Sequence, residues 1–96
     1  MTPVIVPEAQ NEIANALAIS RNAGRLRTAI DRALAAIGAN PMIATRIGRS
    51  RFRRYILTGR IPYSIVYAET ADEIRVVAFA HNARRPGYWK NRLPKN

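Results

Sequence analysis

The spacing of hydrophobic residues along the chain follows a helical period first and a strand period later. Residues 2–6 are a short β-branched run, and the following Pro7-Glu8 is typical of a helix start, because proline needs no N–H there and the carboxylate faces the positive end of the helix dipole. Two amphipathic stretches then predict two helices, which are joined by a tight turn at Asn22-Ala23-Gly24. The positions that follow helical spacing are Ala9, Ile13, Ala16, Leu17 and Ser20 in the first helix, and Leu26, Ala29, Ile30, Ala33, Leu34 and Ile37 in the second, all apolar except Ser20. We expect Gly38 to cap the second helix.

The rest of the chain is predicted to be a loop followed by three strands. Residues 42–50 show no clear period, whereas 52–57, 63–68 and 74–80 are rich in Ile, Val, Tyr and Phe and are separated by turns that suit antiparallel hairpins. The predicted order β-α-α-β-β-β indicates an α+β domain, in which a small antiparallel sheet with an N-terminal strand carries the helical hairpin on one face. The other face is expected to be open and flanked by Arg53, Arg54, Arg84 and Arg85.

Length and composition limit the chain to a single domain over residues 1–96, because a chain of this size does not hold two independent cores. The hydrophobic fraction of 48% supports a compact fold. Without cysteine the chain forms no disulfide, which suits a reducing cytoplasm. No apolar run reaches the roughly 18 residues that span a bilayer, and no secretion signal is recognisable. We therefore expect a cytoplasmic protein with no membrane partner.

Charge is the compositional feature that bears most on function. Sixteen Lys and Arg against six Asp and Glu give a net charge of +10 and a pI near 11.5. Every charged residue between Asp31 and Glu69 is an arginine, and no acidic residue follows Glu73. A positive field of this kind indicates an anionic partner, either a nucleic acid or an acidic protein.

Five segments together carry a resemblance to a known family. They are VPEAQNEI, the helical hairpin, RFRRYIL, IPYSIVY, and IRVVAFAH with its continuation NARRPGYW. Their order and spacing resemble the RelE/ParE superfamily of bacterial type II toxin–antitoxin toxins, and the resemblance covers nearly the whole chain. It implies a cytoplasmic toxin, as in plasmid-stabilisation modules, that forms a hetero-oligomer with a cognate antitoxin bearing an acidic or amphipathic flexible tail. ParE-like members inhibit DNA gyrase without a known catalytic step, whereas RelE-like members are ribosome-dependent mRNA endonucleases.

The candidate site residues differ between these two activities. Metal-independent RNA cleavage needs a base, cations and an acid, and the candidates for these roles are His81, Arg84, Arg85 and Tyr88. Target or partner binding would use Arg53, Arg54, Arg60, Arg84, Arg85, Tyr88 and Trp89. The simpler alternatives are that His81 bonds to backbone and that the aromatic pair closes an edge of the core.

Two departures from the nuclease pattern favour the ParE-like branch. Ser64 stands where the nucleases carry an arginine in the third strand, and the middle of the chain offers no carboxylate base. One histidine, no cysteine and scattered acids predict neither a metal site nor a cofactor. We therefore expect a ParE-like gyrase inhibitor, with the RelE-like endonuclease as the first alternative and a non-toxic basic nucleic-acid-binding domain as the second.

Overall fold

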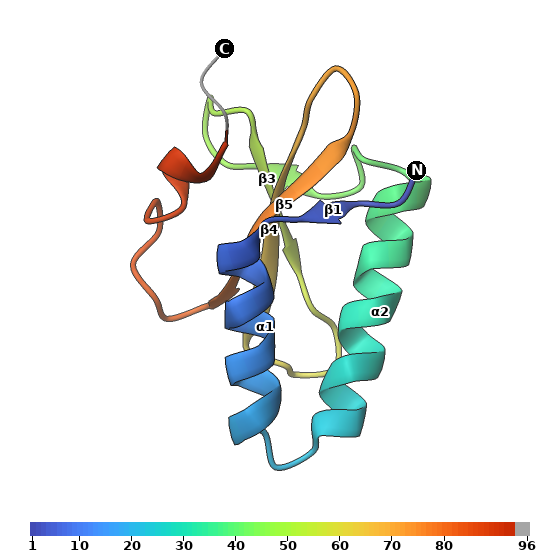
Figure 1. Ribbon diagram of the computed structural model, residues 1–96, viewed down its shortest axis with the longest axis vertical. Helices are drawn as coiled ribbons and strands as arrows, with labels where there is room; N and C mark the ends of the chain where they lie inside the picture. The colour runs from blue at the N-terminus through green and yellow to red at the C-terminus, as the bar shows by residue number, and fades with distance from the viewer. Residues whose placement is uncertain (94–96) are drawn as a thin grey trace.

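The computed structural model describes residues 1–93 as two helices packed on one face of a five-stranded sheet (Figure 1). The strand order is β1-β5-β4-β3-β2, with β1 parallel to β5 and the other pairs antiparallel. The elements are β1 Val4–Ile5, α1 Pro7–Ile19, α2 Ala23–Ala39, β2 Thr45–Arg46, β3 Phe52–Ile56, β4 Tyr63–Glu69, β5 Ile74–His81 and a 3₁₀ turn η1 Lys90–Arg92. The predicted α+β class is confirmed, although the sheet is mixed rather than purely antiparallel.

The helices form where the apolar spacing predicts them, but their ends differ from the prediction. Asn22 does not end α1; it caps α2 by accepting a hydrogen bond from the Arg25 N–H at 3.0 Å. Gly38 does not cap α2, which continues to Ala39. At Gly38 the N-terminal segment passes so close that an added Cβ would lie 2.4 Å from the Met1 carbonyl oxygen. Glycine is therefore required at this position by close approach instead of by a turn.

The buried face of α2 is narrower than its apolar pattern suggests. The buried side chains are Leu26, Ile30, Ala33 and Ile37, which follow helical spacing and face the sheet. Leu34 was also expected on this face but is only half-buried. It lies at the border of the buried face, beside the N-terminal segment. The contact between α2 and the core therefore depends on these four buried side chains rather than on Leu34.

The three predicted strands are confirmed to within one residue at each end, and one further strand was missed. Thr45 and Arg46 pair with Arg54 and Arg53 in the segment that was predicted to be a loop. Both residues of this strand, β2, are exposed, so no alternation of apolar and polar side chains marks it in the sequence. It extends the sheet at the edge beyond β3.

An irregularity in β5 changes which of its backbone groups face outward. Val66 pairs with Ala78 and Tyr67 with Val76, so Val77 is an extra residue in the ladder, as in a β-bulge. Before it, the Val76 carbonyl accepts the Val6 N–H at 3.0 Å from the β1 side. Beyond the end of β1, the outer edge of β5 needs other hydrogen-bonding partners.

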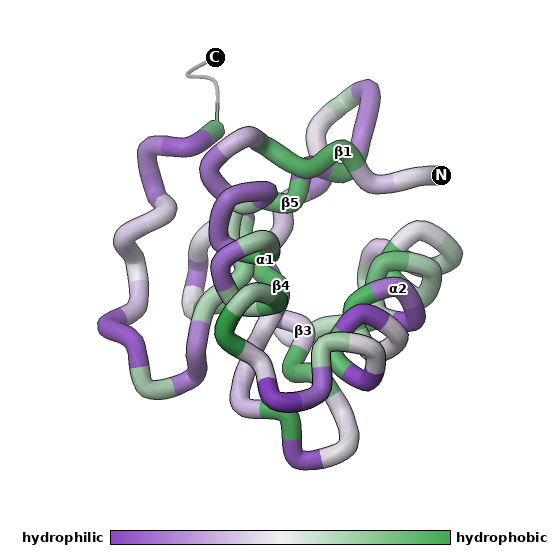
Figure 2. The backbone as a smooth tube through the Cα atoms, turned by 60° about the horizontal axis from the view of Figure 1, so that its bottom comes forward, coloured by the Kyte–Doolittle hydropathy of each residue, from purple (hydrophilic) through white to green (hydrophobic). Residues whose placement is uncertain are grey.

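The sheet face opposite the helices is not open as predicted. Residues 82–93, here called the tail, return along it, and Trp89 and Leu93 keep only 5% and 8% of their surface exposed. Figure 2 shows the tail as a mostly hydrophilic segment beside the strands, so these buried apolar side chains are few among polar ones. Within residues 1–93, neither helix has the length and apolar character needed to cross a bilayer.

Candidate functional site

Glu12 on α1 makes several of the polar contacts that hold the tail on the domain. Its carboxylate accepts hydrogen bonds from the Tyr88 hydroxyl at 2.7 Å, the Arg92 guanidinium at 2.8 Å and the Phe79 backbone N–H at 3.1 Å. Arg84 adds a longer ion pair at 3.4 Å. Since the Glu12 side chain is only 14% exposed, these partners replace the water that the carboxylate would otherwise require.

The same contacts protect the outer edge of β5. At the extra residue, the Val77 carbonyl accepts a hydrogen bond from the Arg92 guanidinium at 2.9 Å. Two residues later, the Phe79 N–H donates to the Glu12 carboxylate. An unpaired strand edge invites pairing with other chains, and proteins commonly cover it. Here an ion pair between α1 and the tail covers it in place of a strand.

Tyr88 lies at the centre of this arrangement. The Arg84 guanidinium stacks 3.8 Å from the centre of its ring, and Arg92 lies 5.0 Å away. Burial and the hydrogen bond to Glu12 raise the pKa of the Tyr88 hydroxyl from its ordinary value near 10 to about 12. The hydroxyl is therefore held as a neutral donor.

This raised pKa predicts a pH dependence of stability. Folding favours the neutral phenol, so its contribution is complete below pH 10, the ordinary pKa, and is lost as the pH rises from 10 toward 12. We expect the difference in unfolding free energy between the native chain and Tyr88→Phe to be constant up to about pH 9 and to change above pH 10. Urea unfolding at several pH values measures it. A difference that does not change over this range would contradict the assigned hydrogen bond.

A small cleft beside the tail brings together two of the predicted basic residues. Its volume is about 90 Å³, and Arg54, Ser64, Asn82 and Arg84 are among the side chains that line it. Arg54 donates to the Ser64 hydroxyl and to the Asn82 side-chain oxygen, each at 3.2 Å. Ser64 is buried and donates to the same Asn82 oxygen. Two guanidinium groups beside one cleft can bind a phosphate or a carboxylate.

His81 borders this cleft, but its ring is oriented by other contacts. It packs edge-on against Tyr63, with ring centres 5.3 Å apart, and its Nδ1 accepts the Ala83 N–H at 3.0 Å. Tyr63 pairs with His81 across the sheet, and strand alternation places both on the opposite face from Ser64. The simpler expectation, that His81 bonds to backbone, is the one the structure has.

The other predicted binding residues do not form one surface. Arg53 donates to the Ala44 carbonyl at 2.7 Å and lies apart from the tail. Arg60 lies in the turn between β3 and β4, Arg85 is exposed on the tail, and Trp89 is buried, as the alternative of a closed core edge expected. The basic residues are thus distributed over the cleft, the tail and the β3–β4 turn.

Three residues of the site were missed in the sequence: Glu12, Asn82 and Arg92. Glu12 sits between the buried Ala9 and Ile13 in sequence, and a carboxylate at the border of a buried helix face was the one available signal. Its partners lie 67 to 80 residues away, and no local pattern connects them.

Within residues 1–93 the structure contains no group of three potential metal-ligating side chains. No protein-family model and no curated protein matches this chain.

Proposed function

We propose that the chain is the toxin of a type II toxin–antitoxin module, that it inhibits DNA gyrase in the manner of ParE-like proteins, and that a cognate antitoxin neutralises it. The resemblance in sequence is the starting point. The resemblance implies a β-α-α-β-β-β order, and the chain has this order with the additional short strand β2 before β3 and with the helical hairpin on one face of the sheet. A net charge of +10 suits an acidic antitoxin and a target that handles DNA.

The observation that favours the non-catalytic branch is that His81 and Tyr88, the two side chains that could transfer a proton, are both engaged in hydrogen bonds within the domain. The Nδ1 lone pair of His81 is used by the Ala83 N–H, and the Tyr88 hydroxyl donates to Glu12. A base that activates a 2′-hydroxyl needs a lone pair directed at the substrate. The carboxylate of Glu12 has its own partners in Arg92, Tyr88 and Phe79.

What the cleft offers is binding. Arg54 and Arg84 line it, and Arg85 is exposed on the neighbouring part of the tail. Guanidinium groups are poor proton acceptors and good ligands for phosphate and carboxylate. This supports a surface that holds an anionic target or antitoxin, in preference to one that cleaves RNA.

The test is the pattern of toxicity when variants are expressed without the antitoxin. His81→Ala should leave toxicity nearly unchanged, whereas Arg85→Glu together with Arg54→Gln should greatly reduce it. Arg32→Glu, at an exposed arginine on α2, is the control for the charge reversal at Arg85. General acid–base catalysis contributes about 10²–10⁴-fold, so an RNA-cutting His81 cannot be replaced without a large loss. Loss of toxicity in His81→Ala with a folded protein would favour the endonuclease.

Removing the tail is a poor test of the same idea. Deletion from Pro86 onward takes away Trp89, Leu93 and the Arg92–Glu12 ion pair, all of which are part of the folded domain. Such a variant would lose activity by unfolding whichever target the protein has.

A further inference from the structure

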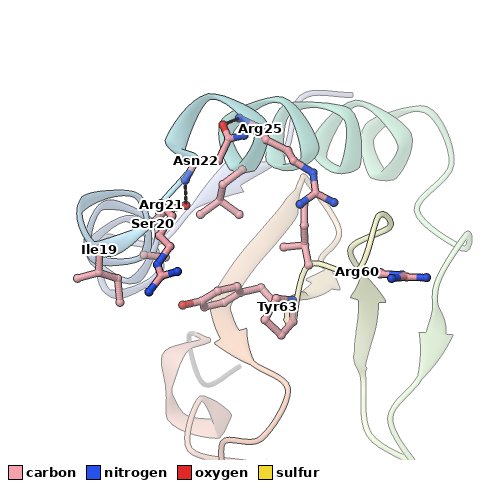
Figure 3. Close-up of a pocket in the computed structure, with 11 residues that line it drawn as sticks. Ile19, Ser20, Arg21, Asn22, Arg25, Arg60 and Tyr63 are labelled. Atoms are coloured by element: carbon pink, nitrogen blue, oxygen red, sulfur yellow. Dashed lines mark hydrogen bonds between the residues drawn. The ribbon is translucent and has the colours of Figure 1, made fainter.

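A second cavity lies at the tip of the helical hairpin, far along the chain from the tail. It has a volume of about 310 Å³ and opens between the end of α1, the start of α2 and the β3–β4 turn (Figure 3). Its apolar wall includes Leu26, Ile61 and Tyr63. Tyr63 is held by stacking on Phe79, with ring centres 4.8 Å apart and planes 7° from parallel. The cavity therefore has a fixed apolar surface.

The mouth of this cavity is positively charged. Arg21, Arg25 and Arg60 are among its lining residues, and none of the chain's six acidic residues is. Arg25 donates to the Gly59 carbonyl, which ties α2 to the turn. Within residues 1–93, the exposed guanidinium groups of Arg21 and Arg60 make no hydrogen bond or ion pair, and Figure 3 shows Arg60 extending outward from the turn. Two cations are thus available at the rim.

The backbone at Arg60 is unusual for an arginine. Its φ is +62°, directly after Gly59 at +77°, and this left-handed region favours glycine and asparagine. Side chains larger than glycine are strained in this region, and within the described residues no hydrogen bond or ion pair of the Arg60 side chain offsets that cost. Backbone outliers of this kind are common at binding sites. This suggests that Arg60 contributes to the binding of a partner rather than to stability.

We propose that the hairpin-tip cavity binds an acidic peptide segment of a protein partner. An aliphatic side chain of the segment enters the cavity against Leu26, Ile61 and Tyr63, and flanking carboxylates pair with Arg21 and, further out, Arg60. That the partner is the antitoxin rests on the proposed function; the preference for an acidic, apolar segment rests on the cavity alone.

A peptide fits these observations better than a nucleic acid. The strongly exposed Ile19, with 78% of its surface accessible, stands at the mouth, and apolar residues form much of the wall. Phosphate binding uses cations and backbone N–H groups without a need for aliphatic surface. A peptide that carries apolar side chains flanked by carboxylates needs both an apolar cavity and cations around it. Flexible acidic segments commonly bind basic proteins in this way.

The experiment is a titration of the ¹⁵N-labelled chain with short designed probes, in which binding is monitored by the chemical shifts of the Leu26, Ile61 and Tyr63 amides. The first probe is an acetylated peptide with two leucines between pairs of glutamates. Three controls replace the leucines by serine, the glutamates by lysine, or the peptide by a short oligothymidylate. We expect saturable shifts at these amides with the first probe alone, and binding about tenfold weaker in Arg21→Gln and in Arg60→Asn, since each loses a charge-assisted contact.

Arg60→Asn gives a second readout that a purely structural arginine would not. Asparagine tolerates the left-handed backbone, so this variant should melt at a higher temperature than the native chain while binding the probe more weakly. Saturable shifts with the oligothymidylate at the same amides would assign the cavity to nucleic acid and overturn the proposal. The absence of shifts at Leu26, Ile61 and Tyr63 with the leucine–glutamate probe would also overturn it, while leaving the toxicity test of the proposed function unaffected.

Discussion

Replacement of Glu12 by alanine should remove the polar contacts between α1 and the tail and lower the free energy of unfolding by about 3 kcal/mol or more. Removing one partner of a largely buried ion pair typically costs about 3–5 kcal/mol, because the other charge is left buried without compensation. Here Arg92 would be that charge, at 18% exposure. The Tyr88 hydroxyl and the Phe79 N–H would lose their acceptor in the same variant. For a small domain with about 5–15 kcal/mol of stability, this is a large fraction.

Urea unfolding measures the loss, and hydrogen exchange at the Phe79 amide locates it. Glu8→Ala is the matched control, since it removes an exposed carboxylate from the first turn of the same helix and should cost less than about 1 kcal/mol through the helix dipole. Glu12→Gln keeps the shape and one acceptor oxygen and should fall between the two. If Glu12→Ala were no more costly than Glu8→Ala, the contacts of Glu12 would not help to hold the tail on the domain.

Replacement of Ile30 by alanine should cost about 2–5 kcal/mol, because it leaves a cavity between α2 and the sheet. Ile30 retains 1% of its surface and belongs to the set of buried residues that face the strands. Leu34→Ala removes a side chain of the same size from a half-buried position, and we expect only about 1 kcal/mol. Chemical denaturation of both variants tests the orientation of α2. Equal costs at the two positions would show that the helix is rotated relative to the structure.

The elements of the fold are readable from the sequence because their signals are local. Helical spacing gave α1 and α2, Pro7 marked the start of α1, and β-branched runs bounded by turns gave β3, β4 and β5. The errors arose where a local signal has two explanations. Gly38 is a typical helix-capping residue, yet here it accommodates the N-terminal segment. Strand β2 is two exposed residues long and has no pattern to detect.

The site is less predictable because it depends on contacts between distant parts of the chain. The arginines were identified as candidates from charge alone, but the way they group could not be predicted. Arg54 donates a hydrogen bond to Asn82, which is distant in sequence, whereas the neighbouring Arg53 donates to the Ala44 carbonyl. The register change at Val77 decides which β5 groups face Glu12, and nothing in the run IRVVAFAH marks it. The sheet face opposite the helices was predicted to be open, whereas Trp89 and Leu93 make the tail that covers it part of the core.

The proposed function separates the domain into structural and binding arginines. Arg92 is structural, since it pairs with Glu12 and covers the edge of β5. Arg85 and Arg60 are exposed and available to a target or a partner. Arg54 and Arg84 border a cleft that can bind an anion, although they also contact Asn82 and Glu12. Mutations in the first group should reduce stability and activity together. Mutations in the second group should reduce binding in a protein that remains folded.

The central claim is most directly tested by adding the purified chain to two reactions in parallel. One is ATP-dependent supercoiling of relaxed plasmid by DNA gyrase, and the other is a translation reaction in which the integrity of the mRNA is followed. A ParE-like protein should block supercoiling, and should do so equally well as His81→Ala, while the mRNA stays intact. Cleavage of mRNA on ribosomes that disappears in His81→Ala, with supercoiling unchanged, would contradict the proposed function.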